Sequence, residues 1–150
     1  METVYQDLST ENWSVSLPDS WTPMDKPNIQ GFYFESEDEE QGLYIATWQF
    51  PENESQSDAE LASNFIDTDR RSFNEMEGYN WKFFEFGCQE NISVVDAYDS
   101  GNNYRISCKV ISKLPILIRT AFHDYNCQDY KSSKQMSDII LGSLKVAGGA

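Results

Sequence analysis

The fold is decided by residues 81–124, which read WKFFEFGCQENISVVDAYDSGNNYRISCKVISKLPILIRTAFHD. Apolar and polar residues alternate in four parts of this stretch, with the period of two that half-buried strands show. The connections are short, because residues 99–102 (DSGN) favour a tight turn and Pro115 breaks the chain between the last two parts. The stretch therefore predicts an antiparallel meander of four strands, over residues 81–88, 92–98, 104–112 and 115–124.

An amphipathic helix is predicted on each side of this meander. Before it, Ser57 and Glu60 fit a capping box, in which each side chain accepts a hydrogen bond from a free amide at the helix start. Apolar residues then recur at helical spacing and Gly78 supplies a stop, so we expect a helix over residues 58–76. A second helix is expected over residues 128–144, with a buried side formed by Tyr130, Met136, Ile139, Ile140 and Leu144.

Three further strands are predicted before the first helix, over residues 13–17, 31–35 and 43–50. A turn follows the first of them, where Pro18 and Asp19 stand. The second and third are joined by an acidic loop, as in a long hairpin, and Pro51 ends the third because proline lacks the amide proton that a ladder needs. Residues 146–150 are expected to be a frayed tail.

The predicted order of elements is βββαββββα, which indicates an α+β fold. Two amphipathic helices need an apolar surface to cover, and an antiparallel sheet of about six to seven strands offers one. No long linker, repeat or low-complexity segment divides the chain. We therefore expect a single domain over residues 1–150, with an ordered core at about residues 12–146.

The chain is strongly acidic. It has 150 residues, with 11 Lys and Arg against 25 Asp and Glu, a formal net charge of -14 and a pI near 4.2. A surface that binds nucleic acid needs positive charge, so no nucleic-acid partner is expected. No stretch has the ~18 continuous apolar residues of a membrane span, and the amino terminus lacks the basic and apolar parts of a signal peptide. The expected location is the cytoplasm, without a membrane span.

The negative charge is concentrated in the first part of the chain. Residues 1–60 hold 14 acidic residues and one basic residue, whereas residues 61–150 hold 11 acidic and 10 basic residues. The densest run lies between stretches that carry Tyr33 and Tyr44. Such a run is either a solvated loop or a docking site for a basic partner protein, in which acids set the association rate and tyrosines serve as anchors. The five acids are Glu35, Glu37, Asp38, Glu39 and Glu40.

One histidine and three cysteines carry the most reactive side chains. Cys88 and Cys108 lie within predicted strands, where cysteine is usually a small hydrophobic residue. Cys127 lies at a predicted helix start, where the helix dipole would lower its pKa, and His123 is the single imidazole. A small-molecule-binding domain or an enzyme using His123 and Cys127 is therefore an alternative interpretation.

No cofactor or metal is expected. The acidic run lacks the spacing of a calcium-binding loop, and the eight glycines form no phosphate-binding loop. No second histidine is present to share a metal with His123, and no nucleophile elbow accompanies it. We therefore expect that the protein is not an enzyme.

Residues 12–21, NWSVSLPDSW, form a short predicted strand that ends in Leu-Pro and is followed by a turn and Trp21. This pattern, with the order of elements over residues 12–146, resembles the PsbP/Mog family of α/β/α sandwich proteins. The resemblance implies a non-enzymatic class that includes a Ran-GTPase-binding protein, a photosystem accessory protein, and bacterial secretion-associated chaperones and small partner proteins. For this chain it implies a protein-binding module of a bacterial immunity or chaperone type. Together with the concentration of negative charge in residues 1–60, it leads us to expect that the module holds a cognate effector or toxin through an acidic surface.

Overall fold

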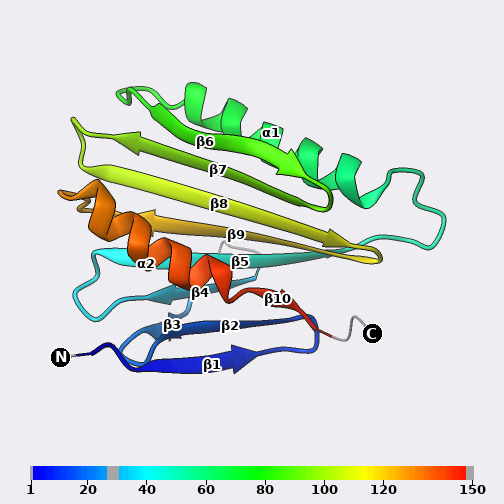
Figure 1. The fold of residues 1–150 in the computed structure, drawn as a ribbon, viewed down its shortest axis with the longest axis horizontal. Helices are drawn as coiled ribbons and strands as arrows, with labels where there is room; N and C mark the ends of the chain where they lie inside the picture. The colour runs from blue at the N-terminus through cyan, green and yellow to red at the C-terminus, as the bar shows by residue number, and fades with distance from the viewer. Residues whose placement is uncertain (1, 27–30, 148–150) are drawn as a thin grey trace.

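The computed structural model describes residues 2–26 and 31–147. They form two antiparallel sheets and two α-helices (Figure 1). The larger sheet has seven strands in the order β3-β4-β5-β9-β8-β7-β6, and the smaller has three in the order β1-β2-β10. The α+β class and the size of the main sheet are as expected from the sequence.

The seven-stranded sheet joins the two halves of the chain. The predicted meander is confirmed as β6 (Lys82–Gln89), β7 (Ile92–Asp99), β8 (Tyr104–Lys113) and β9 (Ile116–Asp124). β5 (Gln41–Gln49) pairs with β9, and β4 (Phe32–Glu35) and β3 (Thr22–Met24) continue the sheet beyond it. Because β5 lies beside β9, side chains from the acidic first part of the chain meet side chains from the end of the meander.

The first helix, α1 (Asp58–Asn74), begins as predicted. The Ser57 hydroxyl accepts a hydrogen bond from the Glu60 amide, and the Glu60 carboxylate accepts one from the Ser57 amide, which confirms the capping box. Gly78, with a φ of 83°, lies in the turn that follows the helix. The buried residues of α1 are Leu61, Ala62, Ile66 and Phe73.

The second helix, α2 (Tyr130–Gly142), begins two residues later than predicted, because Asp129 caps it. The Asp129 carboxylate accepts a hydrogen bond from the Lys131 amide. The prediction was wrong for Ile139, which is 52% exposed. Two serines share the buried side with two apolar residues, and apolar spacing alone does not reveal them; this side consists of Ser133, Ser137, Ile140 and Leu141.

The two faces of the seven-stranded sheet are covered by different elements. α1 packs on one face, while α2 and the three-stranded sheet pack on the other (Figure 1). We call these the α1 face and the α2 face. Side chains alternate between them along each strand, so that in β9 Ala121 belongs to the α1 face and Phe122 to the α2 face.

Three strands were missing from the sequence prediction. β1 (Tyr5–Ser9) and β10 (Lys145–Val146) pair with opposite edges of β2 (Trp13–Pro18), so residues 13–17 lie in the smaller sheet and not in the main one. β3 has three residues, all exposed. β3 and β10 are too short to show an alternation of apolar and polar residues, and β1 has two successive polar residues, Gln6 and Asp7. Val146 therefore belongs to a strand and not to a frayed tail, while residues 148–150 lie outside the described residues.

Candidate functional site

The acidic loop, residues 35–40, joins β4 to β5 and is closed by its own hydrogen bonds. The Ser36 amide donates to the Gln41 carbonyl at 2.9 Å. The Asp38 carboxylate accepts from the Ser36 hydroxyl at 2.7 Å and from the Glu40 amide at 3.0 Å. Glu37, Asp38, Glu39 and Glu40 are exposed. The loop is thus a defined turn that displays its charges to solvent.

Further hydrogen bonds tie the acidic loop to the segment after β9. The Tyr125 amide donates to the Glu40 carbonyl at 2.7 Å, and the Asn126 side-chain amide donates to the Glu40 carboxylate at 2.9 Å. At the other end of the loop, the Tyr33 hydroxyl donates to the Glu35 carboxylate at 2.8 Å. The position of the loop relative to the meander is therefore fixed at its Glu40 end, and its Glu35 end is held to β4.

An aromatic cluster lies beside the acidic loop on the α1 face. The rings of Tyr33 and Tyr44 are 4.3 Å apart between centroids, and the Tyr44 ring is 5.1 Å from His123. Tyr125 is 5.6 Å from His123 and 38% exposed, so the cluster reaches the surface. It consists of Tyr33, Tyr44, Tyr79, Trp81, Tyr104, His123 and Tyr125.

The two tyrosines expected as anchors occupy different depths in this cluster. Tyr33 is 1% exposed, and its ring packs over Gly42, where an added Cβ would lie 2.2 Å from the Tyr33 hydroxyl. Tyr44 is half-buried. Tyr33 therefore forms the buried part of the cluster, whereas Tyr44 and Tyr125 form part of its exposed surface.

Sequence reasoning missed Tyr104 and Tyr125 as parts of the site. The register of β8 and β9 pairs Arg105 with Asp124, so Tyr104 and Tyr125 stand beside each other with ring centroids 5.7 Å apart. The two residues are far apart along the chain, and their proximity follows only from the strand register. The aromatic residues that follow residue 121 can be read from the sequence, but the residues that pack against them cannot.

Burial controls the protonation of the cluster. It raises the pKa of the hydroxyls of Tyr33, Tyr104 and Tyr125, which therefore stay protonated. It lowers the pKa of His123 to about 4, and the positive charge of Arg119 acts in the same direction. His123 is therefore neutral near neutral pH, and its Nδ1 and the Tyr104 hydroxyl share a hydrogen bond of 2.6 Å.

Two shallow hollows flank the acidic loop on the side of α2, and both are bounded by Gln41 and Met136. The first has a volume of about 370 Å³ and is lined by Glu37 and Asp38 among others. The second has a volume of about 390 Å³ and lies between the loop and the start of α2. Its acidic lining residues are Glu40, Asp124 and Asp129.

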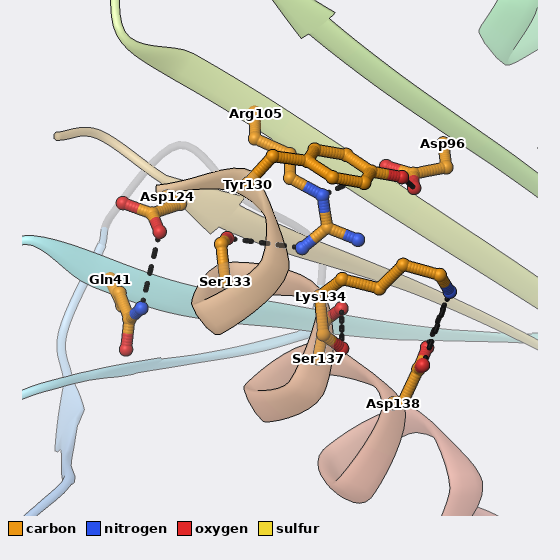
Figure 2. A network of polar contacts seen from close by, with 9 residues as sticks. All are labelled: Gln41, Asp96, Arg105, Asp124, Tyr130, Ser133, Lys134, Ser137 and Asp138. Atoms are coloured by element: carbon orange, nitrogen blue, oxygen red, sulfur yellow. Dashed lines mark hydrogen bonds and ion pairs between the residues drawn. The ribbon is translucent and has the colours of Figure 1, made fainter. Parts of the chain in front are cut away.

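A buried ion pair holds the start of α2 beside the second hollow (Figure 2). Arg105 is 0% exposed, and its Nε donates to the Asp96 carboxylate at 2.9 Å. The Tyr130 hydroxyl donates to the same carboxylate, and Arg105 Nη1 donates to the Ser133 hydroxyl at 3.1 Å. Because Tyr130 and Ser133 belong to α2, this network fixes the helix to β7 and β8.

The structure does not form the alternative site of His123 and Cys127. His123 lies on the α1 face within the aromatic cluster, whereas the Cys127 thiol is hydrogen-bonded to Ser133 of α2. Burial raises the pKa of Cys127, so the expectation of a pKa lowered by the helix dipole was wrong. Cys127 precedes the Asp129 cap and is 1% exposed, which removes it from the end of the dipole and from solvent.

The other two cysteines differ in their environments. Cys108 is 0% exposed, and burial raises its pKa to about 12, as suits a small residue of the core. Cys88 was also interpreted as a small hydrophobic residue within a strand, but it is exposed, because it lies on β6 at the edge of the sheet. The alternation of the sequence does not distinguish an edge strand from a central one.

Among residues 2–26 and 31–147, no group of three or more His, Cys, Asp and Glu side chains is arranged to hold a metal ion. In the same described part of the chain, no helix has the length and apolar character needed to cross a membrane.

Comparison with known proteins shows that the fold is an α+β fold of the PsbP type. No protein-family model and no curated protein matches the sequence. The cyanobacterial PsbP (CyanoP) of Synechocystis sp. PCC 6803 is similar in structure, with a TM-score of 0.66 and 11% sequence identity. The match covers 97% of this chain and 94% of that chain. The fold expected from residues 12–21 and the order of elements is thereby confirmed.

A protein from Bacteroides thetaiotaomicron VPI-5482 has a similar fold, with a TM-score of 0.53 and 11% identity. The match covers 91% of this chain but 46% of that chain, so this chain spans about half the length of the Bacteroides protein. Identities at this level establish the fold alone.

Proposed function

We propose that the protein is a non-catalytic module that binds a basic partner protein through the acidic loop and the aromatic cluster. One observation carries the proposal. Four exposed acids are held in a closed turn, and this turn is hydrogen-bonded to Tyr33 and Tyr125 of a partly exposed aromatic cluster. Aromatic residues supply most of the energy at many protein interfaces, while surrounding charges steer the approach of the partner.

The arrangement also suits basic side chains. The hollow next to Glu40, Asp124 and Asp129 is bounded by carboxylates, and a lysine or arginine of the partner would enter it with its charge compensated. The loop already has internal hydrogen bonds in the absence of a partner, so binding orders few additional groups. Both features favour association with a basic surface.

We further propose that the module belongs to a bacterial immunity or chaperone type and acts in the cytoplasm on a cognate effector or toxin. The PsbP-like fold supports the first part, in view of the resemblance described above. The three cysteines are unpaired, which agrees with a reducing compartment. A toxin and its immunity protein are expected to be encoded side by side, which names a first partner to test.

The test measures binding to the protein encoded by the neighbouring gene. In the loop variant, the five acids of residues 35–40 are changed to the corresponding amides. We expect its Kd to rise by about tenfold or more, because the change removes attraction to the partner but keeps the shape of the loop. In the matched control, five exposed acids elsewhere are changed in the same way: Glu11, Glu52, Glu75, Glu77 and Glu90.

Equal affinity of the loop variant and the wild type contradicts the proposal. Equal weakening of the loop variant and the control also contradicts it, because net charge and not the site would then explain the binding.

A groove of about 450 Å³ between α1 and the sheet favours a second candidate function, the binding of a small molecule. Its walls include the rings of Trp48 and Phe65, which are 5.0 Å apart, and the ion pair of Arg119 with Asp69. Neither His123 nor Cys127 lines it. Small-molecule screening by NMR tests this candidate: shifts at Trp48 and Phe65 support it, and a screen without such shifts contradicts it.

A further inference from the structure

We propose that β6 is a self-association edge, at which two copies of this chain pair their β6 strands antiparallel into one continuous sheet. The proposal concerns the opposite end of the sheet from the acidic loop and does not depend on the proposed function. It rests on the exposure of β6, on the distribution of charge across the sheet and on the sequence of the strand.

The two edges of the seven-stranded sheet differ in how well they are protected. β3 has three residues and contains Pro23, which cannot donate a backbone hydrogen bond. β6 has eight residues and no proline. A bulge between Phe83 and Glu85 protects only the first part of β6, so residues 85–89 form a regular unpaired edge.

Apolar side chains are exposed along this unprotected edge. Phe84 and Phe86 are each 45% exposed, and Ile92 at the start of β7 is 38% exposed. A shallow groove of about 540 Å³ runs along residues 85–92, where Gly87 leaves open space beside the strand. Exposed aromatic rings beside free backbone groups are characteristic of edges that add a further strand.

The distribution of charge favours a second copy of this chain as the partner that pairs with β6. Residues 61–150 hold 11 acidic and 10 basic residues, so the part of the chain that carries β6 is almost neutral. The strand order places β4 and β5, and with them the acidic loop, toward the edge opposite β6. A pair joined at β6 therefore keeps the two acidic regions at the outer ends of the combined sheet, where their repulsion is weakest.

The sequence of β6 selects a register centred on Gly87. In this register Glu85 stands opposite Gln89 of the second copy, and Phe86 stands opposite Cys88 of the second copy. No two charges of the same sign face each other. Because such pairing is symmetric and uses the unprotected edge of both copies, it stops at a dimer and does not grow into a fibre.

The mass of the protein in solution tests the pairing. We expect the mass to rise from 17.3 kDa toward twice this value as the concentration increases in light-scattering measurements. Phe86→Glu places a charge at the pairing edge, next to Arg70, whose guanidinium lies 5.1 Å from the Phe86 ring centroid. This variant is expected to fold and to dimerise more than about tenfold less tightly. Ile139→Glu on α2, an apolar position with an exposure of 52% against 45% for Phe86, is the control and keeps the wild-type dimer.

Chemical cross-linking tests the register. Cys88 is the exposed cysteine, and in the proposed register the two Cys88 side chains are diagonal neighbours about 7–8 Å apart. A short bismaleimide should join two chains, and Cys88→Ser should abolish the product. A wild-type mass of 17.3 kDa at every concentration overturns the proposal, as does unchanged dimerisation of Phe86→Glu. A dimer without the Cys88 product overturns the register.

Discussion

The α2 face of the seven-stranded sheet is closed by α2 together with the three-stranded sheet, whereas the α1 face carries one helix and an aromatic cluster that reaches the surface (Figure 1). Each face contains one ion pair between a strand arginine and an aspartate. On the α2 face the side chains of Arg105 and Asp96 are 0% and 2% exposed, whereas on the α1 face those of Arg119 and Asp69 are 29% and 12% exposed. The comparison indicates that the ion pair on the α2 face is closed off from solvent, whereas the ion pair on the α1 face remains partly open to it.

The largest expected effect comes from breaking the two ion pairs in turn. Asp96→Ala leaves the buried Arg105 charge without its partner, so the free energy of unfolding should fall by about 3–5 kcal/mol. Asp69→Ala leaves Arg119 able to reach solvent, and a loss of about 1 kcal/mol is expected. Urea unfolding of both variants measures the difference. Equal losses would show that the two faces are equally closed.

The next effect concerns His123 on the α1 face. Its pKa in the folded protein is about 4, below the usual 6.5. Between these values the unfolded chain binds more protons than the folded one, so stability is lost as the pH falls from 6.5 toward 4, by at most about 3 kcal/mol. Above this range His123 adds no pH dependence.

His123→Gln removes the titrating group and should flatten this part of the stability profile. Because carboxylates titrate in the same range, the quantity to compare is the difference between wild type and variant in urea unfolding at each pH. A difference that stays constant between pH 6.5 and 4 would contradict the assignment of a buried neutral histidine.

A smaller effect distinguishes two tyrosine hydroxyls. Tyr130→Phe removes a hydrogen bond to the buried Asp96 carboxylate and should cost about 2 kcal/mol. Tyr125→Phe removes a hydroxyl that lies 3.0 Å from the Tyr33 hydroxyl, which still has Glu35 as a partner, so a cost below about 1 kcal/mol is expected. Thermal or urea unfolding compares the two, and a larger cost for Tyr125→Phe would contradict this order.

Sequence reasoning succeeded where local signals agreed with the fold. The capping box at Ser57 and Glu60 and the alternation in residues 81–124 depend on neighbouring residues, and both appear in the structure. It failed for β1, β3 and β10, which are short and are stabilised by pairing rather than by their own sequence. It also failed for Ile139 and Cys88, because helix orientation and strand order decide their exposure.

The candidate site could be predicted only in part. The acidic loop and the neighbouring Tyr33 and Tyr44 were visible, because they are close in the sequence. The contribution of Tyr104 and Tyr125 depends on the pairing of β8 with β9, and that of His123 on the pairing of β5 with β9. A site assembled across strands requires the register, which no local pattern supplies.

The acidic loop is tested most directly as a docking site by the salt dependence of the association rate with the partner protein encoded by the neighbouring gene. The loop variant should remain folded, because the amide oxygens can still accept the hydrogen bonds that close and anchor the loop. It should associate more slowly at low salt and show a shallower dependence on salt, whereas the control with five other acids changed should keep the wild-type slope. Identical rates and slopes for the loop variant and the wild type would contradict the claim that the acidic loop is the docking site.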